Sequence, residues 1–493
     1  MHLSHLLQRL KREDLLAAPS ATAESVDTKT IDHLAEDSRA VGPDGCFVAL
    51  RGTQTDGHLF IDKAVQNGAT AVVCEEVPAE ASERFPGTLF LRVTDSRRAL
   101  ATLAAAFYGD PARELAMVGV TGTNGKTTTA YVLHHVLSAL GETAGLIGTI
   151  ETRVGPEVVE GALTTPSALD VQRLLRRMVD AGCTTCAMEV SSHALDQERV
   201  AAIPYDVGIF TNLTADHLDY HGTLVEYRAA KKRLFDALSG EATALYNIDD
   251  PASPEIIADT RANRVAYGRD EQADIRVAVL DDRPDGLRLR LDGAVRSFQV
   301  VGTFNSYNLA AAYGAARALE HAAEPVLEAL AAAPPVPGRV EQIVFDDGTT
   351  VVVDYAHTPD ALENVLHTLR SIKDPAAALW CVFGCGGDRD TSKRRVMGSI
   401  AEQYADRVIV TSDNPRTEEP AAIMNGIRRG MSRPADAQWI EDREEAIRAA
   451  AEQAAPGDVV LIAGKGHETY QVVGTEKRPF DDRDMARQYF SER

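Results

Sequence analysis

Cysteine is scarce in this chain, which has six cysteines among 493 residues. That number is too small for the dense disulfide framework of small secreted domains. Cys183 and Cys186 form a C-x-x-C pair, but the sequence holds no second such pair to complete a zinc ribbon. The residues from Thr184 to Val190 read as a buried strand, so we attribute both thiols to packing. A reducing compartment, the cytoplasm, is the expected location.

Long hydrophobic runs are absent as well. No stretch of about 18 apolar residues free of charge occurs, which excludes a membrane-spanning helix. The N-terminal segment MHLSHLLQRLKRED carries charges throughout and is unlike a signal peptide. We therefore expect no membrane partner.

Basic residues are outnumbered: 51 Lys and Arg stand against 73 Asp and Glu, for a formal net charge of −22. So acidic a chain repels nucleic-acid phosphates at long range, which argues against non-specific nucleic-acid binding. It does not forbid a nucleotide site, because a few backbone amides, a lysine and a metal ion suffice to hold phosphates. Hydrophobic residues make up 44%, which is ordinary for a globular protein. We expect small-molecule substrates, no nucleic-acid partner and a monomer.

The length predicts about three domains, at roughly 150 residues each. Residues 1–112 form a small α/β domain that closes at the turn Gly109-Asp110-Pro111. Residues 113–336 end in the stiff, proline-rich linker Pro334–Gly338, and residues 337–493 follow it. Apolar runs alternate with helical stretches, which is typical of α/β domains. The predicted strands are Cys46–Leu50, Ala71–Cys74, Leu115–Val120, Thr185–Val190, Val207–Thr211, Thr350–Asp354, Leu379–Gly384, Arg407–Thr411 and Val459–Ala463, and the predicted helices are Thr127–Leu140, Ser167–Ala181, a pair within Asn308–Ala333, and Asp360–Arg370.

A glycine-rich loop, Thr121-Gly122-Thr123-Asn124-Gly125-Lys126-Thr127-Thr128, stands between a predicted strand and a predicted helix. Its glycines let backbone N–H groups turn toward phosphate oxygens, and the helix presents its positive end. Lys126 would reach the outer phosphates, and the Thr127 hydroxyl would ligate Mg²⁺. The pattern G-x-x-G-K-T-T is a shortened Walker motif, because Val120 stands where the full motif has glycine. We predict a nucleotide phosphate site here.

Two more loops follow predicted strands of the second domain. Glu189 ends one strand, at the edge of the sheet where sites gather, and is a candidate Mg²⁺ ligand. Taken alone, such a glutamate is more often a solvated or capping group. The loop from Thr211 to Gly222 holds two histidines and two aspartates, which suit metal and proton chemistry and equally suit a polar turn. The helix Tyr227–Phe235 carries four cations, and spacing alone does not separate a functional lysine from a solvated face.

Three loops that follow predicted strands of the third domain carry Arg389, Asn414 with Arg416, and Glu468. Because the carboxyl ends of parallel strands meet at one edge, these loops define one crevice. The arginine forks suit a carboxylate and Glu468 suits an ammonium, which is the arrangement an amino acid needs. Each loop alone would be a surface turn; three at strand ends favour a site.

With these features in order, the chain resembles the Mur ligase family over nearly its whole length. The matching motifs are GTNGKTTT, TTPSALD, EVSSHALDQERV, DHLDYHG, EYRAAKKRLF, FNSYN, PGRVE, DYAHTPD, GCGGDRD, DNPR and GKGHE. The resemblance implies a small uridine-binding N-terminal α/β domain, a central P-loop ATPase-like domain with a parallel or mixed sheet covered by helices on both faces, and a C-terminal Rossmann-like domain that binds an amino acid. It also implies a cytoplasmic, ATP-dependent amide ligase of peptidoglycan biosynthesis that acts through an acyl phosphate.

The resemblance implies roles for individual residues, matched motif by motif. The residues that the resemblance implies for ATP binding are Gly122, Thr123, Asn124, Gly125, Lys126, Thr127, Thr128, Asn308, Arg339 and Asp354. The resemblance implies that Thr127 and Glu189 ligate one Mg²⁺. His217 and Lys231 match a second metal position, and the lysine at that place is carbamylated in this family. Lys126, Glu189, His217 and Lys231 would be catalytic. The residues implied to bind the acceptor, UDP-N-acetylmuramoyl-L-alanyl-D-glutamate, are Ser38, Thr53, Gln54, Thr55, Thr164, Thr165, Ser191, Gln197 and Arg199. Near them in the sequence, Glu36 and Leu163 depart from the family pattern.

The identity of the added amino acid depends on Asp413-Asn414-Pro415-Arg416. In the family, D-N-P-R goes with meso-2,6-diaminopimelate, whose far carboxylate pairs with Arg416, whereas L-lysine would leave the arginine without its anion. Arg389, Gly464 and Glu468 complete the implied diaminopimelate site. Three alternatives are an L-lysine-adding ligase of the same family, a folylpolyglutamate synthetase, and a switch that only hydrolyses ATP.

Overall fold

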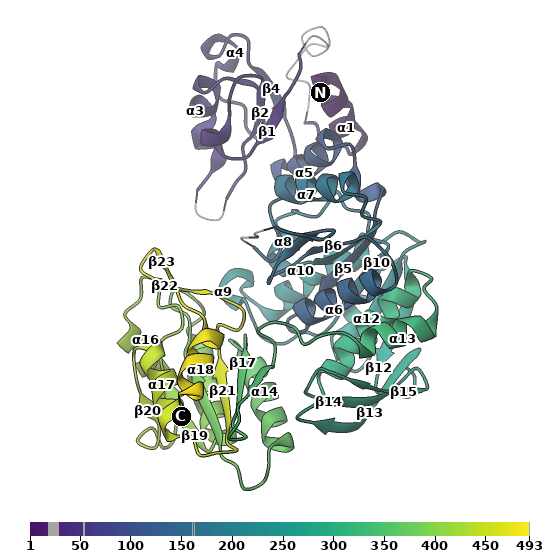
Figure 1. The fold of residues 1–493 in the computed structure, drawn as a ribbon. Coiled ribbons are helices and arrows are strands. Elements are labelled where there is room, and N and C mark those ends of the chain that lie inside the picture. The colour runs from purple at the N-terminus through teal and green to yellow at the C-terminus, as the bar shows by residue number, and fades with distance from the viewer. Residues whose placement is uncertain (18–28, 53–54, 160, 162, 493) are drawn as a thin grey trace.

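The computed structural model describes residues 1–17, 29–52, 55–159, 161 and 163–492. Three sheets with their own helices follow one another along the chain (Figure 1), which confirms the α/β class in three domains. The boundaries after residues 112 and 336 stay a prediction. Within the described ranges, none of the helices combines the length and the apolar character needed to cross a bilayer.

The N-terminal sheet has four parallel strands in chain order. Leu3, Leu6 and Leu10 of α1 are fully buried, and this one-sided spacing explains why the segment forms a helix against α5. Helix α5 also contacts α7 of the central domain, and the two lie between the domains in Figure 1. The strands are β1 (His33–Ala35), β2 (Gly45–Val48), β3 (Ala69–Cys74) and β4 (Leu89–Arg92); the helices are α1 (Leu3–Arg12), α3 (Ile61–Gln66), α4 (Ala81–Arg84) and α5 (Ser96–Phe107), with 3₁₀ turns at Ser38–Ala40, Gly57–Phe60 and Pro111–Arg113.

The central sheet has eleven strands in the order β15-β14-β13-β12-β11-β10-β5-β9-β6-β7-β8. Its middle part, from β13 to β6, is parallel. The strands are β5 (Ala116–Thr121), β6 (Ala144–Ile147), β7 (Thr152–Val154), β8 (Glu157–Val159), β9 (Thr185–Glu189), β10 (Val207–Phe210), β11 (Thr243–Asn247), β12 (Asn263–Gly268), β13 (Ile275–Arg283), β14 (Gly286–Leu291) and β15 (Ala294–Phe298). The sheet is therefore mixed, as the resemblance implies.

Both faces of the central sheet are covered by helices. One core joins the sheet to α6, α12 and α13, and a second core joins it to α7 and α10. The helices are α6 (Lys126–Ala139), α7 (Ala168–Asp180), α8 (Ser192–Asp196), α9 (Leu218–His221), α10 (Leu224–Asp236), α11 (Ser253–Ile256), α12 (Asn305–Ala318) and α13 (Ala323–Ala331). The predicted alanine-rich pair is confirmed, although its first helix begins at Asn305 rather than Asn308.

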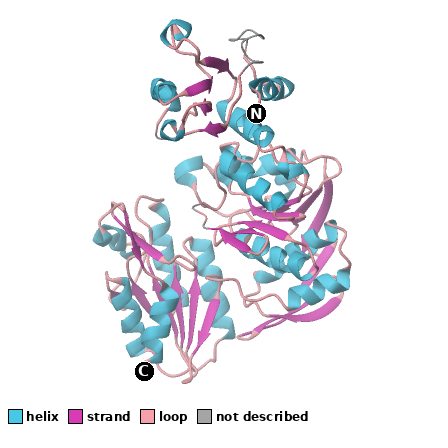
Figure 2. Ribbon diagram, turned by 45° about the horizontal axis from the view of Figure 1, so that its top comes forward, coloured by secondary structure: helices cyan, strands magenta, loops and turns pink. Residues whose placement is uncertain are grey.

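The C-terminal sheet has the order β16-β17-β21-β18-β19-β20, and only the β16–β17 pairing within it is antiparallel. Helices flank this sheet on both sides (Figure 2). A separate antiparallel hairpin, β22–β23, follows the last parallel strand. The strands are β16 (Glu341–Val344), β17 (Thr350–Asp354), β18 (Leu379–Phe383), β19 (Arg407–Val410), β20 (Gln438–Trp439), β21 (Val459–Ala463), β22 (Tyr470–Val473) and β23 (Glu476–Pro479); the helices are α14 (Pro359–Ile372), α15 (Ser392–Tyr404), α16 (Pro420–Arg428), α17 (Arg443–Gln453) and α18 (Asp482–Ser491).

Candidate active site

The phosphate loop joins β5 to α6 at the carboxyl edge of the central sheet. Gly125 has φ +86°, and a Cβ there would lie 2.4 Å from Asn308 Oδ1, so the loop needs glycine at this position. Helix α6 begins at the next residue, Lys126, and its first amides are free to bind phosphate. Lys126 Nζ donates to the loop's own carbonyls, at 2.9 Å to Gly122 O and 2.8 Å to Thr123 O. Burial lowers the pKa of Lys126, and an anionic phosphate beside it would oppose that shift.

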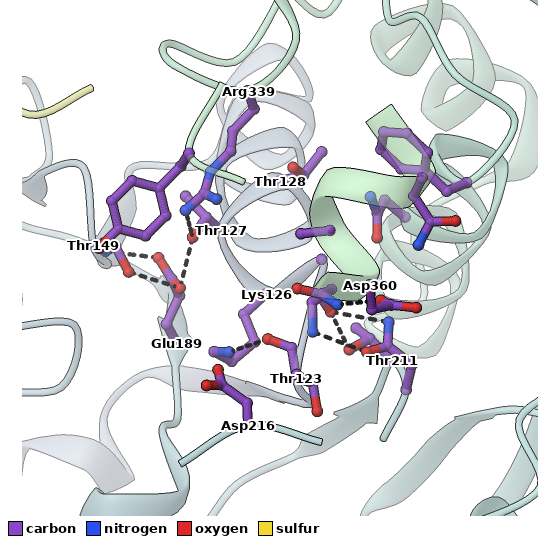
Figure 3. Close-up of a pocket in the computed structure, with 18 of the residues that line it drawn as sticks. Thr123, Lys126, Thr127, Thr128, Thr149, Glu189, Thr211, Asp216, Arg339 and Asp360 are labelled. Carbon is purple, nitrogen blue, oxygen red and sulfur yellow. Dashed lines mark hydrogen bonds between the residues drawn. The ribbon is translucent and has the colours of Figure 1, made fainter. Parts of the chain in front are cut away.

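Glu189 and Thr127 meet beside the loop (Figure 3). The Thr127 hydroxyl donates to Glu189 Oε2 at 2.9 Å and accepts from Arg339 at 3.1 Å. Thr149 donates to Glu189 twice, from its backbone N at 2.7 Å and its hydroxyl at 3.0 Å. Glu189 is therefore buried but fully hydrogen-bonded, with its carboxylate facing the loop.

This pair of oxygen donors fits a Mg²⁺ ion. A carboxylate and a hydroxyl are the hard ligands that Mg²⁺ takes, with waters and nucleotide phosphates completing its octahedron. Among the described residues, no group of three or more His, Cys, Asp or Glu is arranged to hold a metal ion by itself. Such a site would thus depend on the nucleotide for most of its ligands.

Lys231 is the buried cation of α10, with 1% of its surface exposed. Its Nζ donates to Gly122 O at 2.7 Å and lies 4.2 Å from the centre of the Tyr227 ring. Burial first, and the nearby Lys126 charge second, lower the pKa of Lys231 well below its usual value. The solvated-face interpretation therefore fails for this lysine, whereas the other three cations of the helix form ion pairs at its surface: Arg228 with Glu255, Lys232 with Asp259, and Arg233 with Glu198.

His217 lies in the left-handed region, with φ +54°, where a non-glycine residue is strained. Its backbone N–H donates to Asp216 Oδ1 at 2.9 Å. Burial lowers the pKa of His217 to about 3, although Asp216 opposes the shift, so its imidazole is neutral near pH 7 and able to ligate a metal. The His193 ring packs edge-on against it, with the ring centres 4.8 Å apart.

Residues that follow the linker line the same cavity as the phosphate loop, and two of them, Arg339 and Asp360, hydrogen-bond it. Asp354 accepts from Val340 N and Ala356 N, both at 2.7 Å, which fixes the backbone that follows the linker against the end of β17. Asn124 Nδ2 donates to Asp360 Oδ2 at 2.6 Å across the domains. Burial raises the pKa of Asp360, the last residue of the DYAHTPD motif, for which the resemblance implied no role.

The three loops predicted to form the amino-acid crevice lie together in the third domain, because Arg416 hydrogen-bonds Gly387 and Asn414 hydrogen-bonds Glu468. Asp413 Oδ1 accepts from Asn414 N at 2.6 Å, while its Oδ2 is buried and without a partner among the described residues. A Cβ at Gly464 (φ +117°) would lie 2.4 Å from that oxygen, so glycine leaves room for the carboxylate. Arg416 is held at φ +52° by pairing with the β22 strand, and its guanidinium donates to Gly387 O at 2.7 Å.

The acceptor residues fall into two groups. In the central domain, Thr165 donates to the Glu189 carbonyl at 2.8 Å and accepts from Ser191 N at 3.0 Å. Arg199 donates to Gln197 Oε1 at 2.7 Å, and both line a cavity of about 190 Å³ with Glu36 of the first domain. Burial raises the pKa of Glu36, which lies against the Ser167 hydroxyl. Ser38 and Thr55 lie in the N-terminal domain, Leu163 is exposed, and Thr53 and Gln54 lie outside the described residues.

One cavity of about 280 Å³ collects most of the predicted nucleotide and metal residues. It is lined by Thr123, Asn124, Gly125, Lys126, Thr127, Thr128, Thr164, Glu189, Ser191, His217, Lys231, Asn308, Arg339 and Asp354. The amino-acid crevice, Ser38 and Thr55 do not line it. The cavity also contains Thr149, Asn305, Asp216, Tyr227, His357 and Asp360, which sequence reasoning missed. All of these except Thr149 stand in quoted motifs, which was a candidate signal: Asp216 in DHLDYHG, Tyr227 in EYRAAKKRLF, Asn305 in FNSYN, and His357 and Asp360 in DYAHTPD.

Comparison with known families covers all three domains. Residues 30–108 match the catalytic domain of the Mur ligase family, residues 120–316 the Mur ligase middle domain, and residues 338–466 the glutamate ligase domain of Mur ligases.

Individual relatives extend the match to nearly the whole chain. The UDP-N-acetylmuramoyl-L-alanyl-D-glutamate--2,6-diaminopimelate ligase of Cytophaga hutchinsonii is 46% identical over 450 residues, covering 91% of this chain and 92% of the relative. The enzyme of the same name from Parabacteroides distasonis is 43% identical over 488 residues, covering 98% and 99%.

Solved structures are similar to this chain over most of its length. A structure of a UDP-N-acetylmuramoyl-L-alanyl-D-glutamate--2,6-diaminopimelate ligase superposes with a TM-score of 0.66 at 33% identity, covering 96% of this chain and 97% of that one. Folylpolyglutamate synthase of Thermotoga maritima shares the fold at 16% identity and a TM-score of 0.58, over 74% of this chain and 90% of its own. By its sequence and its fold, the chain belongs to the Mur ligase family.

Proposed function

We propose that the chain is an ATP-dependent ligase that adds meso-2,6-diaminopimelate to the D-glutamate of UDP-N-acetylmuramoyl-L-alanyl-D-glutamate, a step of peptidoglycan biosynthesis. The observation that carries the proposal is the identity of 46% over 450 residues with a relative named for this reaction. The matched segments cover 91% and 98% of this chain, so the match is not limited to the nucleotide-binding domain.

The reaction has to activate a carboxylate, which is a poor electrophile. A carboxylate oxygen of the D-glutamate attacks the γ-phosphorus of ATP, ADP leaves, and an acyl phosphate forms. The amine of diaminopimelate then attacks the acyl carbon, phosphate leaves with the former carboxylate oxygen, and the amine gives up a proton. Lys126 and the free amides of α6 stabilise the charge that develops on the phosphoryl oxygens.

Thr127 and Glu189 would hold Mg²⁺ in this reaction. The ion supplies positive charge next to the phosphates when it is bound. Arg339 and Thr149 fix the two ligands, because they hydrogen-bond the hydroxyl of one and the carboxylate of the other. His217 and Lys231 would form the second metal position.

A carbamate on Lys231 would turn a cation into a carboxylate-like ligand. Its amine would attack carbon dioxide and lose a proton, which requires a neutral amine. The lowered pKa of Lys231 supplies that neutral form. Its burial beside the phosphate loop supports the assignment.

The crevice of the third domain supports diaminopimelate as the added amino acid. Arg416 offers a guanidinium to the far carboxylate, while Glu468 and the unpartnered oxygen of Asp413 offer carboxylates to an ammonium. All six cysteines are free and buried, which suits the reducing cytoplasm where these substrates would be met. A monomeric state stays a prediction.

Oxygen-isotope transfer tests the proposed chemistry. The acceptor is prepared with ¹⁸O in all oxygens of both free carboxylates of its D-glutamate and incubated with ATP, Mg²⁺ and diaminopimelate. One ¹⁸O per turnover should appear in inorganic phosphate, because the acyl phosphate carries that oxygen away. Phosphate formed without the label, or formed without acceptor, would instead indicate simple ATP hydrolysis.

A further inference from the structure

A lysine without any exposed side-chain surface, Lys465, lies against Asn414 and Glu468 of the predicted amino-acid crevice. It follows β21 in the same loop as Glu468, which stands three residues farther on. Burying an ammonium is costly unless the group is paired and hydrogen-bonded, so its partners reveal what it does.

Lys465, Asn414 and Glu468 form a closed triangle of hydrogen bonds. Lys465 Nζ donates to Glu468 Oε2 at 2.9 Å and to Asn414 Oδ1 at 3.1 Å. The third side is Asn414 Nδ2, which donates to the same Glu468 Oε2 at 2.9 Å. Val472 N donates to Asn414 Oδ1 at 2.9 Å, which ties the triangle to the β22 strand.

Both hydrogen bonds that Glu468 accepts in the triangle go to the same carboxylate oxygen. Oε2 receives two donors, whereas no donor among the described residues reaches Oε1. A carboxylate held through one oxygen cannot rotate freely, so Oε1 is presented in one direction. That oxygen is the acceptor left for the ammonium of an amino acid.

Lys465 also sets the charge of this end of the crevice. The Lys465–Glu468 pair is formally neutral, so Glu468 attracts an additional cation less strongly than a lone carboxylate would. A ligand that offers only an ammonium gains little binding free energy from Glu468. A ligand whose carboxylate is also bound by Arg416 gains binding free energy from both contacts. The pair thus favours a zwitterionic end group over a purely cationic one.

We propose that Lys465 is a positioning residue that aims Glu468 Oε1 at the substrate ammonium and makes the crevice select diaminopimelate over L-lysine. The inference rests on the proposed ligase function and deepens it. Lys465 acts only through Glu468 and Asn414, and contacts no substrate.

The variant Lys465→Met tests the proposal, because methionine keeps an unbranched apolar stem and removes the ammonium. We expect KM for diaminopimelate to rise at least about tenfold, as for a lost hydrogen bond to a charged group, with KM for ATP changed less than about twofold. The ratio of kcat/KM for diaminopimelate over L-lysine should fall at least about tenfold. Lys477→Met is the matched control: Lys477 lies 4.2 Å from the centre of the neighbouring Tyr470 ring but is exposed, and its variant should keep wild-type kinetics.

A double variant keeps the test decisive if the single variant folds poorly. Lys465→Met combined with Glu468→Gln removes both charges and leaves no unpaired buried ion. Since Lys465 acts through Glu468, this double variant should have the KM for diaminopimelate of Glu468→Gln alone. A further tenfold rise, or wild-type kinetics and selectivity in Lys465→Met, would overturn the inference. Wild-type protein that forms no product with diaminopimelate would overturn the proposed function instead.

Discussion

Lys231 and Lys465 are both buried cations, and each lies against a loop that we assign to a substrate. Their settings differ. Lys465 has a carboxylate partner, Glu468, whereas Lys231 has a backbone carbonyl and the face of the Tyr227 ring. A lysine with no anionic partner is readily deprotonated, which is the property that a carbamate requires.

Replacing Lys231 with alanine should reduce turnover by at least about a hundredfold, the scale of a lost group at the reacting phosphate. A short-chain carboxylic acid in the buffer should restore part of the activity, because it can occupy the place of the carbamate. Lys232→Ala is the matched control, since that neighbour pairs with Asp259 at the surface. Full activity of Lys231→Ala would remove the residue from the proposed mechanism.

The local sequence predicted the functional role of some site residues but not of others. The glycine spacing and the following helix made Lys126 a clear candidate from local chemistry alone. Lys231 stands beside Lys232 in a helix with four cations, and only the family resemblance selected it, because burial depends on what α10 packs against. Asp360 ends the DYAHTPD motif, but its role did not follow from that motif, because its bond to Asn124 joins positions far apart in the chain.

At the scale of secondary structure elements, continuous apolar runs were the reliable signal. Strands β17 and β21 begin and end where the sequence predicted, because strands buried on both faces read as unbroken runs of Val, Leu and Ile. Strands β13 to β15 were not predicted: they lie at the edge of the central sheet and pair antiparallel with one another, and β13 and β15 are neither continuously apolar nor regularly alternating. Such strands depend on pairing with a neighbour more than on their own composition.

Helix α6 carries a histidine whose protonation should weaken the fold. His134 Nε2 is buried without a hydrogen-bond partner among the described residues, and burial lowers the pKa of His134 to about 4 from 6.5. The unfolded chain therefore binds this proton at a higher pH than the folded one, so stability is lost as the pH falls from 6.5 toward 4. His134→Gln should reduce that acid-dependent loss in the free energy of unfolding by about 2 kcal/mol.

Chemical denaturation at several pH values measures the effect. His5→Gln, at an exposed position of α1, should leave the pH dependence unchanged. Parallel pH profiles for His134→Gln and the wild type would contradict the assignment.

Helices α17 and α18 are joined by an ion pair with no exposed surface, between Arg443 and Asp482. Arg443 also donates to the carbonyls of Ala463 and Ser412, which begin two of the crevice loops. Removing one partner of such a pair leaves an uncompensated buried charge, so Arg443→Met should lower the free energy of unfolding by about 3–5 kcal/mol. Arg478→Met, which breaks the exposed pair with Glu476, should cost less than about 1 kcal/mol.

Thermal or denaturant unfolding of the two arginine variants separates these outcomes. Equal losses in the free energy of unfolding would show that the buried Arg443–Asp482 pair stabilises the fold no more than the exposed Arg478–Glu476 pair does.

On the scale of the whole molecule, the central and C-terminal domains meet at the phosphate loop. The contacts include the hydrogen bonds from Asn124 to Asp360 and from Arg339 to Thr127, and Figure 3 shows the second of these beside Glu189. The sequence separated these domains at the proline-rich linker, but contacts between distant segments left no local pattern from which to predict them.

Asp360→Ala should therefore let the substrate-free protein open. We expect small-angle scattering to give a larger radius of gyration for this variant than for the wild type, with the difference reduced by ATP and acceptor together. Asp374→Ala, an exposed position of the same domain, should scatter like the wild type. Identical scattering by all three proteins would show that the Asn124–Asp360 bond does not hold the domains together.

The measurement that tests the account most directly is the initial rate of phosphate release from ATP with UDP-N-acetylmuramoyl-L-alanyl-D-glutamate present. Three reactions run in parallel, with meso-diaminopimelate, with L-lysine and with no amine. We predict release with diaminopimelate and little with either of the others, as expected for a ligase whose crevice holds both ends of a zwitterion. Release with lysine alone would overturn the specificity that we assign to Arg416 and Lys465, and equal release in all three reactions would contradict the ligase function itself.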